Sequence, residues 1–268
     1  MSKKRWILLI LCLLVAGCAI FYIVFSVTRN QRGEDAYDEL RNLTTPTTEA
    51  TTPTPSVTFQ PVLPSQPTEP TKPPFVSPKD FQSLQERNPD IYAWLEVTDT
   101  TVDYPVLQHE YLPNYYLNHT VDHVAGETPG AIYSQTGTDQ NLGDFVTVLY
   151  GHNMGNGTMF GNLHKYHDES YLMDHRQIVM YTPEGTYTYT IIAAVKYGNH
   201  LITGSYDFST EAGRQEFLDS LDDVRYLNNH LLTDTEYGTD DRYLVLSTCI
   251  SDHNYRYIVV GVLTNEET

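Results

Sequence analysis

The chain has 268 residues and a formal net charge of −18, because 34 acidic residues outnumber 16 basic ones. Every acidic residue lies after residue 33, and the sequence beyond that point holds no cluster of positive charge of the kind that binds nucleic acid. We therefore expect no nucleic-acid partner. Such acidity is typical of a soluble surface in contact with water.

The first expected element is a membrane-spanning signal anchor over residues 6–27. This apolar run contains no charged residue and exceeds the roughly 20 residues that a helix needs to cross a bilayer. The three basic residues before it favour a cytoplasmic N-terminus over residues 1–5. A cleaved signal peptide is a weaker alternative, because the run is long and lacks a small-residue cleavage site at its end. A lipoprotein modified at Cys18 is also a weaker alternative. We expect a single-pass protein of the cell membrane with an extracellular domain.

Residues 28–76 are expected to form an extracellular stalk. Thr and Pro dominate the sequence between residues 44 and 78. Proline lacks a backbone donor and favours extended conformations, so a segment rich in proline acts as a semi-rigid spacer. We therefore place the folded domain over residues 77–268.

The folded domain is expected to open with a short helix. Ser77 followed by Pro78 is typical of a helix start, and Asn88 followed by Pro89 is typical of a helix end. We expect a second helical turn over residues 91–95, before the first strand.

Short runs rich in β-branched and aromatic residues follow, separated by turn residues. The candidate strands are Thr101–Val106, Gly130–Ser134, Phe145–Tyr150, Ile178–Thr182, Tyr187–Val195, Tyr243–Thr248 and Tyr255–Leu263. One helix is predicted among them near residues 210–224, where Ser209 can cap a segment with apolar residues at helical spacing. The pattern predicts a mainly β domain, an antiparallel barrel with added helices.

Cys249 is the only cysteine outside the apolar run that holds Cys12 and Cys18. An exported domain with one cysteine has no disulfide framework. A free cysteine is most often a small buried core residue, and the alternative is a nucleophile. Cys249 ends a predicted strand, which favours an accessible position at a strand edge.

Two residues could assist such a nucleophile. Arg256 begins the strand after a short turn, so it can lie beside Cys249 and stabilise a thiolate or an oxyanion. His152 follows a predicted strand and Gly151, and an imidazole there can take or give the proton of a thiol. The structural alternatives are an exposed strand arginine and an ordinary loop histidine.

Two histidine pairs have the spacing of metal ligands, His119 with His123 and His164 with His167. Neither pair has a further Cys or His beside it at metal-binding spacing. The sequence also lacks a glycine-rich phosphate loop and a Gly-x-Ser-x-Gly motif. We expect neither a metal nor an organic cofactor.

Several ordered segments resemble sortases. Leu246–Cys249 followed by Arg256 is similar to the catalytic cysteine and arginine segment of that family. Tyr150–Met154 with Met159–Gly161 resembles the histidine segment of class B sortases. The resemblance extends from about Phe81 to Leu263. It departs from the family pattern at Val245, Pro113 and Asn114, and in the short segment 251–255.

The resemblance implies a closed sortase β-barrel of about eight strands with N-terminal helices and one inserted helix near 210–224. It implies that Cys249 attacks the C-terminal sorting signal of a secreted surface protein and forms a thioester. His152 would act as general acid and then as base, and Arg256 would stabilise the oxyanion. The residues that would line the peptide groove are Leu117, Ser247 and Thr248.

The acyl group would then pass to an amine of a cell-wall peptidoglycan precursor or of a pilin subunit, at a Gram-positive-type cell surface. Two other classes of protein fit parts of the pattern. An exported cysteine peptidase that hydrolyses cell-wall or surface peptides would share the cysteine and the histidine. A non-enzymatic binding module on a stalk would explain the Thr/Pro segment and the many tyrosines, but it has no use for Cys249 and Arg256.

Overall fold

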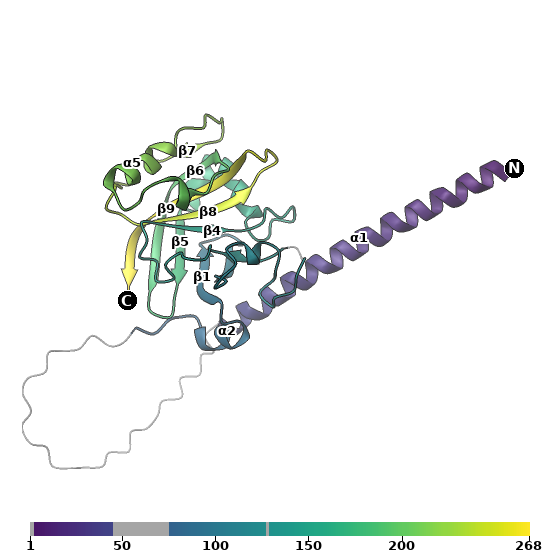
Figure 1. Cartoon of the computed structure of the whole chain (residues 1–268), viewed down its shortest axis with the longest axis horizontal. Coiled ribbons are helices and arrows are strands. Elements are labelled where there is room, and N and C mark those ends of the chain that lie inside the picture. Colours follow the sequence, from purple (N-terminus) through teal and green to yellow (C-terminus); the bar gives the residue numbers. More distant parts are fainter. Residues whose placement is uncertain (1–2, 45–74, 127–128) are drawn as a thin grey trace, which may run out of the picture.

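A computed structural model describes residues 3–44, 75–126 and 129–268 (Figure 1). Its first element is a single helix, α1 (Lys3–Thr44), which projects from the rest of the chain at its N-terminal end. Within α1 the segment Ile10–Thr28 has a mean hydropathy of 2.7, and none of it is buried in the protein. By length and composition this segment could cross a membrane, although a signal sequence has the same properties.

The C-terminal end of α1 packs against the folded domain. Tyr37 and Leu40 are fully buried. The Tyr37 hydroxyl donates a hydrogen bond to the carbonyl of Gly130, and the Tyr37 ring meets the Tyr104 ring edge to face at 5.4 Å between centroids. Residues 28–44, for which the start of a stalk was predicted, are helical, and the domain buries Tyr37 and Leu40 of this segment.

Charged side chains surround this apolar contact. Arg41 donates from Nε to the carbonyl of Asp103 at 2.8 Å. Arg87 binds Glu39 of α1 at 2.9 Å and also binds Asp122 at 2.9 Å. The Thr/Pro-rich residues 45–74, for which a stalk was predicted, lie outside the described residues, so that part stays a prediction.

The first elements of the domain differ in detail from those predicted. Helix α2 (Phe81–Arg87) is capped by Asp80, whose carboxylate accepts from the backbone of Ser83 at 3.1 Å, so Ser77 is not its cap. The predicted helical turn over residues 91–95 is wrong, because Ile91–Val97 forms strand β1. β1 is paired on both sides and almost fully buried, so it lacks the alternation that marks an exposed strand.

The strands close into a barrel in the order β5-β1-β2-β3-β4-β8-β9-β6, which the pairing of β5 with β6 completes. The remaining strands are β2 (Asp103–Leu107), β3 (Ile132–Tyr133), β4 (Val146–Tyr150), β5 (Gln177–Tyr181), β6 (Thr186–Gly198), β7 (His230–Leu231), β8 (Tyr243–Cys249) and β9 (Tyr255–Glu267). β7 adds a short ninth strand beside β6. The prediction of a closed, mainly β barrel of about eight strands is confirmed.

The barrel is mixed and not purely antiparallel as predicted. β2 pairs parallel with β3, and β4 pairs parallel with β8. Strands β5, β6 and β7 lie between β4 and β8 in the chain. A parallel pair needs such a long connection, whereas an antiparallel pair can be joined by a tight turn. This parallel pair brings the ends of two distant segments to the same edge.

Short helices flank the barrel. They are η1 (Tyr115–Leu117), η2 (Gly161–His167), α3 (Glu169–Asp174), α4 (Ile202–Ser205) and α5 (Glu211–Ser220). Helices α4 and α5 pack on the apolar cluster on its outer face, whereas η1, η2 and α3 add side chains to the inner cluster. The helix predicted near residues 210–224 is α5, with Thr210 as its cap where Ser209 was expected. Phe217 of α5 packs on the outer face of β4 and β8, next to Phe145 and Tyr243.

Side chains along β8 alternate between two apolar clusters. Leu244 and Leu246 belong to the cluster inside the barrel, and Val245 belongs to the cluster under α5 on the outer face. Because side chains on a strand alternate in direction, Cys249 lies on the outer side together with Val245. The strand thus delivers Cys249 to the outer surface at the barrel's edge.

Candidate active site

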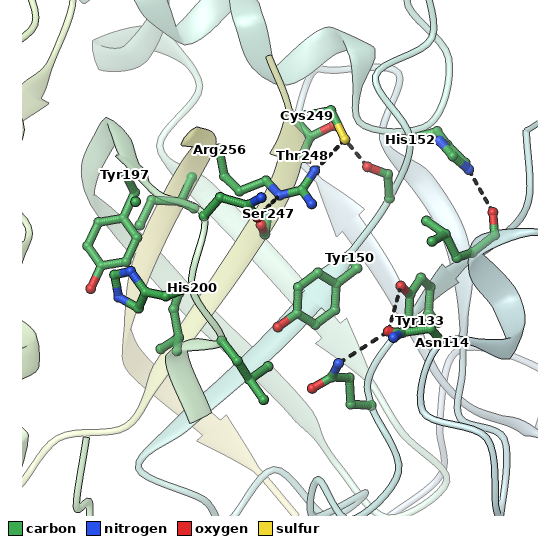
Figure 2. Close-up of a pocket in the computed structure, with 18 residues that line it drawn as sticks. Asn114, Tyr133, Tyr150, His152, Tyr197, His200, Ser247, Thr248, Cys249 and Arg256 are labelled. Carbon is green, nitrogen blue, oxygen red and sulfur yellow. Dashed lines mark hydrogen bonds between the residues drawn. The ribbon is translucent and has the colours of Figure 1, made fainter. Parts of the chain in front are cut away.

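Cys249 and Arg256 face each other across two antiparallel strands. Cys249 is the last residue of β8, and its direct partner in the ladder is Arg256 at the start of β9. The guanidinium Nη1 donates a hydrogen bond to the sulfur of Cys249 (Figure 2). Cys249 is partly exposed to solvent. A cation bonded to a thiol sulfur favours the thiolate form, which is the nucleophile.

Asn199 holds the Arg256 side chain in this position. Its Oδ1 accepts from Arg256 Nε at 2.8 Å. Its own backbone and side-chain amides donate to the carbonyls of Asn254 and His253, each at 2.9 Å. Asn199 was not predicted from the sequence, because nothing local marks a residue that reaches the site from the end of β6.

His152 reaches the same edge through the parallel pair of β4 and β8. Tyr150 pairs with Ser247, so the residues after each strand emerge side by side. The Thr248 hydroxyl donates to the carbonyl of Gly151 at 2.9 Å and ties the two strand ends together. The three residues predicted for chemistry, Cys249, His152 and Arg256, therefore line one cleft.

The His152 ring is oriented by the backbone of η1. Its Nε2 lies 2.6 Å from the carbonyl oxygen of Leu117, and Figure 2 draws this contact as a dashed line from the His152 ring. A carbonyl oxygen only accepts, so Nε2 carries a proton. The neutral ring then has Nδ1 as its acceptor, which is the nitrogen able to take a further proton.

Gly151 has no room for a side chain, which predicts a large effect of adding one. A Cβ there would lie 2.5 Å from Cδ1 of Ile132 and 2.7 Å from the ring of Phe160. Gly151→Ala is expected to lower the free energy of unfolding by about 1–3 kcal/mol and to displace His152. Gly155→Ala is the control, since nothing lies within 4 Å of its Cβ position. Denaturant unfolding with equal midpoints for both variants would contradict this close packing.

The cleft extends beyond the three residues toward the end of β6. Leu117, Ser247 and Thr248, predicted as groove residues, all line it. Thr248 and Ser247 are buried, and the Thr248 hydroxyl is engaged with the backbone of Gly151, so it contributes chiefly by fixing the strand ends. The sequence analysis did not identify further lining residues, which include Asn114, Tyr133, Tyr150 and the segment 197–202.

Two tyrosines form one wall of the cleft. The rings of Tyr133 and Tyr150 stack at 5.5 Å between centroids, below Arg256 in Figure 2. Burial raises the pKa of Tyr150 to about 12 and also raises the pKa of Tyr133. Both phenols are therefore neutral at physiological pH; the Tyr133 hydroxyl donates to Oδ1 of Asn114 at 3.4 Å.

The histidine pairs considered as zinc ligands are engaged in other contacts. His119 stacks on Tyr115 at 3.8 Å between ring centroids, and His164 stacks on Tyr257 at 5.4 Å. Among residues 3–44, 75–126 and 129–268 no group of three or more His, Cys, Asp or Glu side chains is placed to hold a metal ion.

The arrangement is suited to acyl transfer through a thiol. Arg256 lies where it can stabilise a thiolate and then the oxyanion that forms next to the sulfur. His152 offers a proton acceptor at the rim of the same cleft.

Comparison with known proteins agrees with this chemistry. Residues 95–264 match the family model of the sortase domain. Sortase B of Listeria monocytogenes is 29% identical over 191 residues, which cover 70% of this chain and 75% of that protein. Sortase B of Staphylococcus aureus is 30% identical over 191 residues, which cover 68% and 73%.

The fold agrees as well. The crystal structure of sortase B from B. anthracis in complex with AAEK1 superposes with a TM-score of 0.69 at 23% identity, and the match covers 89% of this chain and 99% of that chain. Because the family model spans more than half of the sequence and both relatives are sortases B, the chain belongs to the sortase family of cysteine transpeptidases, and within it to class B.

Proposed function

We propose that this enzyme cleaves a C-terminal sorting signal of secreted surface proteins and transfers the acyl group to an amine. The observation that carries the proposal is the hydrogen bond from Arg256 to the sulfur of Cys249 at the edge of a cleft. A structural cysteine would have no need of a guanidinium on its sulfur. The accepting amine would belong to a peptidoglycan precursor or to a pilin subunit.

In the first half of the reaction, the Cys249 thiol passes its proton to Nδ1 of His152, and the resulting thiolate adds to the carbonyl carbon of the scissile peptide bond. Arg256 donates to the oxyanion, because its Nη1 already lies at the sulfur. The C–N bond breaks, the leaving amine takes a proton from His152, and a thioester remains on Cys249.

In the second half, an amine adds to the thioester carbon and loses its proton to His152. The C–S bond breaks, and Cys249 leaves as a thiolate beside Arg256. The new bond is an amide or isopeptide bond, and no metal or organic cofactor enters the reaction.

The location that we propose is the outer face of a cell membrane. The support is the apolar segment Ile10–Thr28 of α1, together with the basic residues that precede it in the sequence. In this arrangement α1 is a single-pass anchor, and the barrel lies on the extracellular side.

The test uses the full chain in detergent with a pooled library of synthetic peptides and hydroxylamine as a small acceptor. Wild-type protein is expected to gain the mass of an acyl fragment on Cys249 and to release peptide hydroxamates. Cys249→Ala is expected to lose both signals, by at least about 10³-fold in rate. The double variant Cys12→Ser, Cys18→Ser removes the other thiols and is expected to retain activity, since both lie in the apolar segment.

The outcomes separate the three classes of function. Free carboxylic acids without hydroxamates would indicate a peptidase. Peptide binding without any cleavage or acyl adduct would indicate a binding module. Either result would overturn the proposal.

A further inference from the structure

A second cavity adjoins the active-site cleft at the end of β8. We call it the histidine pocket, and the lining residues used below are Asn153, His164, His167, Lys196, Asp252 and Tyr257. His152 and Cys249 line the cleft. Asn153 and Ile250, the residues that follow them in the chain, line the histidine pocket. The two cavities therefore meet where these two segments of chain pass the nucleophile.

The register of three strands puts the two cavities on opposite faces of the sheet. Cys249, Arg256 and Tyr197 are cross-strand partners and line the cleft. Tyr257 and Lys196 are the neighbouring pair on β9 and β6, and they line the histidine pocket. Because side chains alternate in direction along a strand, the pocket lies on the inner side, at the mouth of the barrel.

The walls of the pocket are bonded to the nucleophilic residue itself. His164 Nε2 lies 3.3 Å from the carbonyl oxygen of Cys249, and Asn153 Nδ2 donates to the same oxygen at 3.1 Å. This carbonyl and the sulfur belong to one residue. The histidine pocket therefore contacts the backbone of the residue that carries the nucleophilic sulfur.

The pocket walls are aromatic. The His167 and Tyr257 rings meet edge to face at 4.4 Å between centroids, and His164 stacks on Tyr257. Burial lowers the pKa of His164 and of His167, so both rings are neutral at neutral pH. Aromatic faces attract an ammonium group, and a neutral imidazole does not repel it.

Two further features bear on the charge and polarity of a ligand. Lys196 is paired with Asp252 at 3.5 Å, which compensates its positive charge. The Tyr257 hydroxyl is buried and has no hydrogen-bond partner within the described ranges of the chain. A buried polar group of this kind is costly unless a ligand or water satisfies it.

We propose that the histidine pocket binds the acceptor substrate, an aliphatic primary amine, and directs it at the acyl group on Cys249. This proposal rests on the proposed function, since it needs an acyl-enzyme. The donor acyl group occupies the cleft on the outer face, so the amine approaches from the barrel mouth past Asn153 and His164. The amine reaches the pocket as an ammonium and loses one proton to solvent before it attacks. The attack follows the second half-reaction above, with the second proton passing to His152.

The test places a fixed positive charge in the pocket. His167→Arg is expected to raise the KM for Nα-acetyl-lysine amide by at least about tenfold, since it places a like charge beside the ammonium in a partly buried site. The KM for hydroxylamine, which is uncharged at neutral pH, is expected to stay within about twofold. His167→Gln keeps the pocket neutral and is expected to raise the KM for the lysine amide less than about threefold. Gln82→Arg adds the same charge on exposed α2 and is the control.

The readouts keep this proposal separate from the proposed function. Formation of the acyl-enzyme without any amine tests the proposed function and is expected to be equal in all four proteins, as are their melting temperatures. If acyl-enzyme forms normally but the KM for the lysine amide is unchanged in His167→Arg, the pocket proposal is wrong while the proposed function stands. An equal rise in the KM for hydroxylamine in His167→Arg would also overturn the pocket proposal. Absence of acyl-enzyme in the wild type would overturn both the pocket proposal and the proposed function.

Discussion

Arg256→Ala is expected to lower kcat/KM for acyl transfer by about 10²- to 10³-fold, the usual cost of removing one oxyanion donor. The physical reason is that Arg256 Nη1 bonds the sulfur of Cys249 at the point where negative charge develops. Loss of the guanidinium removes stabilisation both from the thiolate and from the transition state. The measurement is the rate of hydroxamate formation at subsaturating peptide, with acyl-enzyme formation followed by mass spectrometry.

Arg256→Lys distinguishes geometry from charge. A lysine keeps the charge but cannot bond Asn199 and the sulfur at once as the planar guanidinium does. We expect kcat/KM of Arg256→Lys to exceed that of Arg256→Ala by less than about tenfold. Arg225→Ala removes an exposed arginine and serves as control. Full activity in Arg256→Ala would show that the hydrogen bond to the sulfur has no part in the reaction.

Tyr37→Ala is expected to lower the free energy of unfolding by about 3–5 kcal/mol, the cost of truncating a large buried aromatic residue. The Tyr37 side chain is fully buried between α1 and the domain, packs on Tyr104 and donates to the carbonyl of Gly130. Its removal leaves a cavity and an unpaired carbonyl in the contact that fixes α1. Denaturant unfolding of the full chain in detergent measures the change.

The matched control lies on the same helix. Leu43 is 45% exposed, and Leu43→Ala is expected to change stability by no more than about 0.5 kcal/mol. If Tyr37→Ala and Leu43→Ala unfold at the same denaturant concentration, the docking of α1 does not contribute to the stability of the domain.

The sequence predicted most strands and the proximity of Arg256 to Cys249, because both depend on local signals. A strand, a short turn and a second strand make two residues neighbours whatever the rest of the chain does. The parallel pairing of β4 with β8 was not predictable in this way. Nothing in a strand's own side chains specifies the direction of its partner. The position of His152 after a predicted strand marked it as a candidate and the family resemblance gave its role, but its place beside Cys249 depends on that pairing.

The errors share a physical cause. β1 was taken for a helical turn because strands on both sides bury it and suppress its alternation. The helical residues 28–44 were assigned to the stalk because they contain few apolar side chains. Those that are buried, Tyr37 and Leu40, are buried by contact with the domain, which the local sequence does not reveal. Asn199 was missed for the same reason, since its role comes from a contact with Arg256 across the sheet.

The docking of α1 also sets the height of the catalytic cleft. The apolar segment ends at Thr28 and the docked residue Tyr37 follows on the same helix, so at a rise of 1.5 Å per residue they are separated by about 14 Å along the axis. If the segment crosses a membrane as proposed, the short continuous helix between them holds the barrel close to the bilayer surface. Residues 45–74 come between α1 and α2 in sequence, and both helices contact the domain. The number of residues in this segment therefore does not determine how far the domain lies from the membrane. Substrates must then come to the membrane plane, and lengthening the Thr/Pro segment would not extend the enzyme further into the wall.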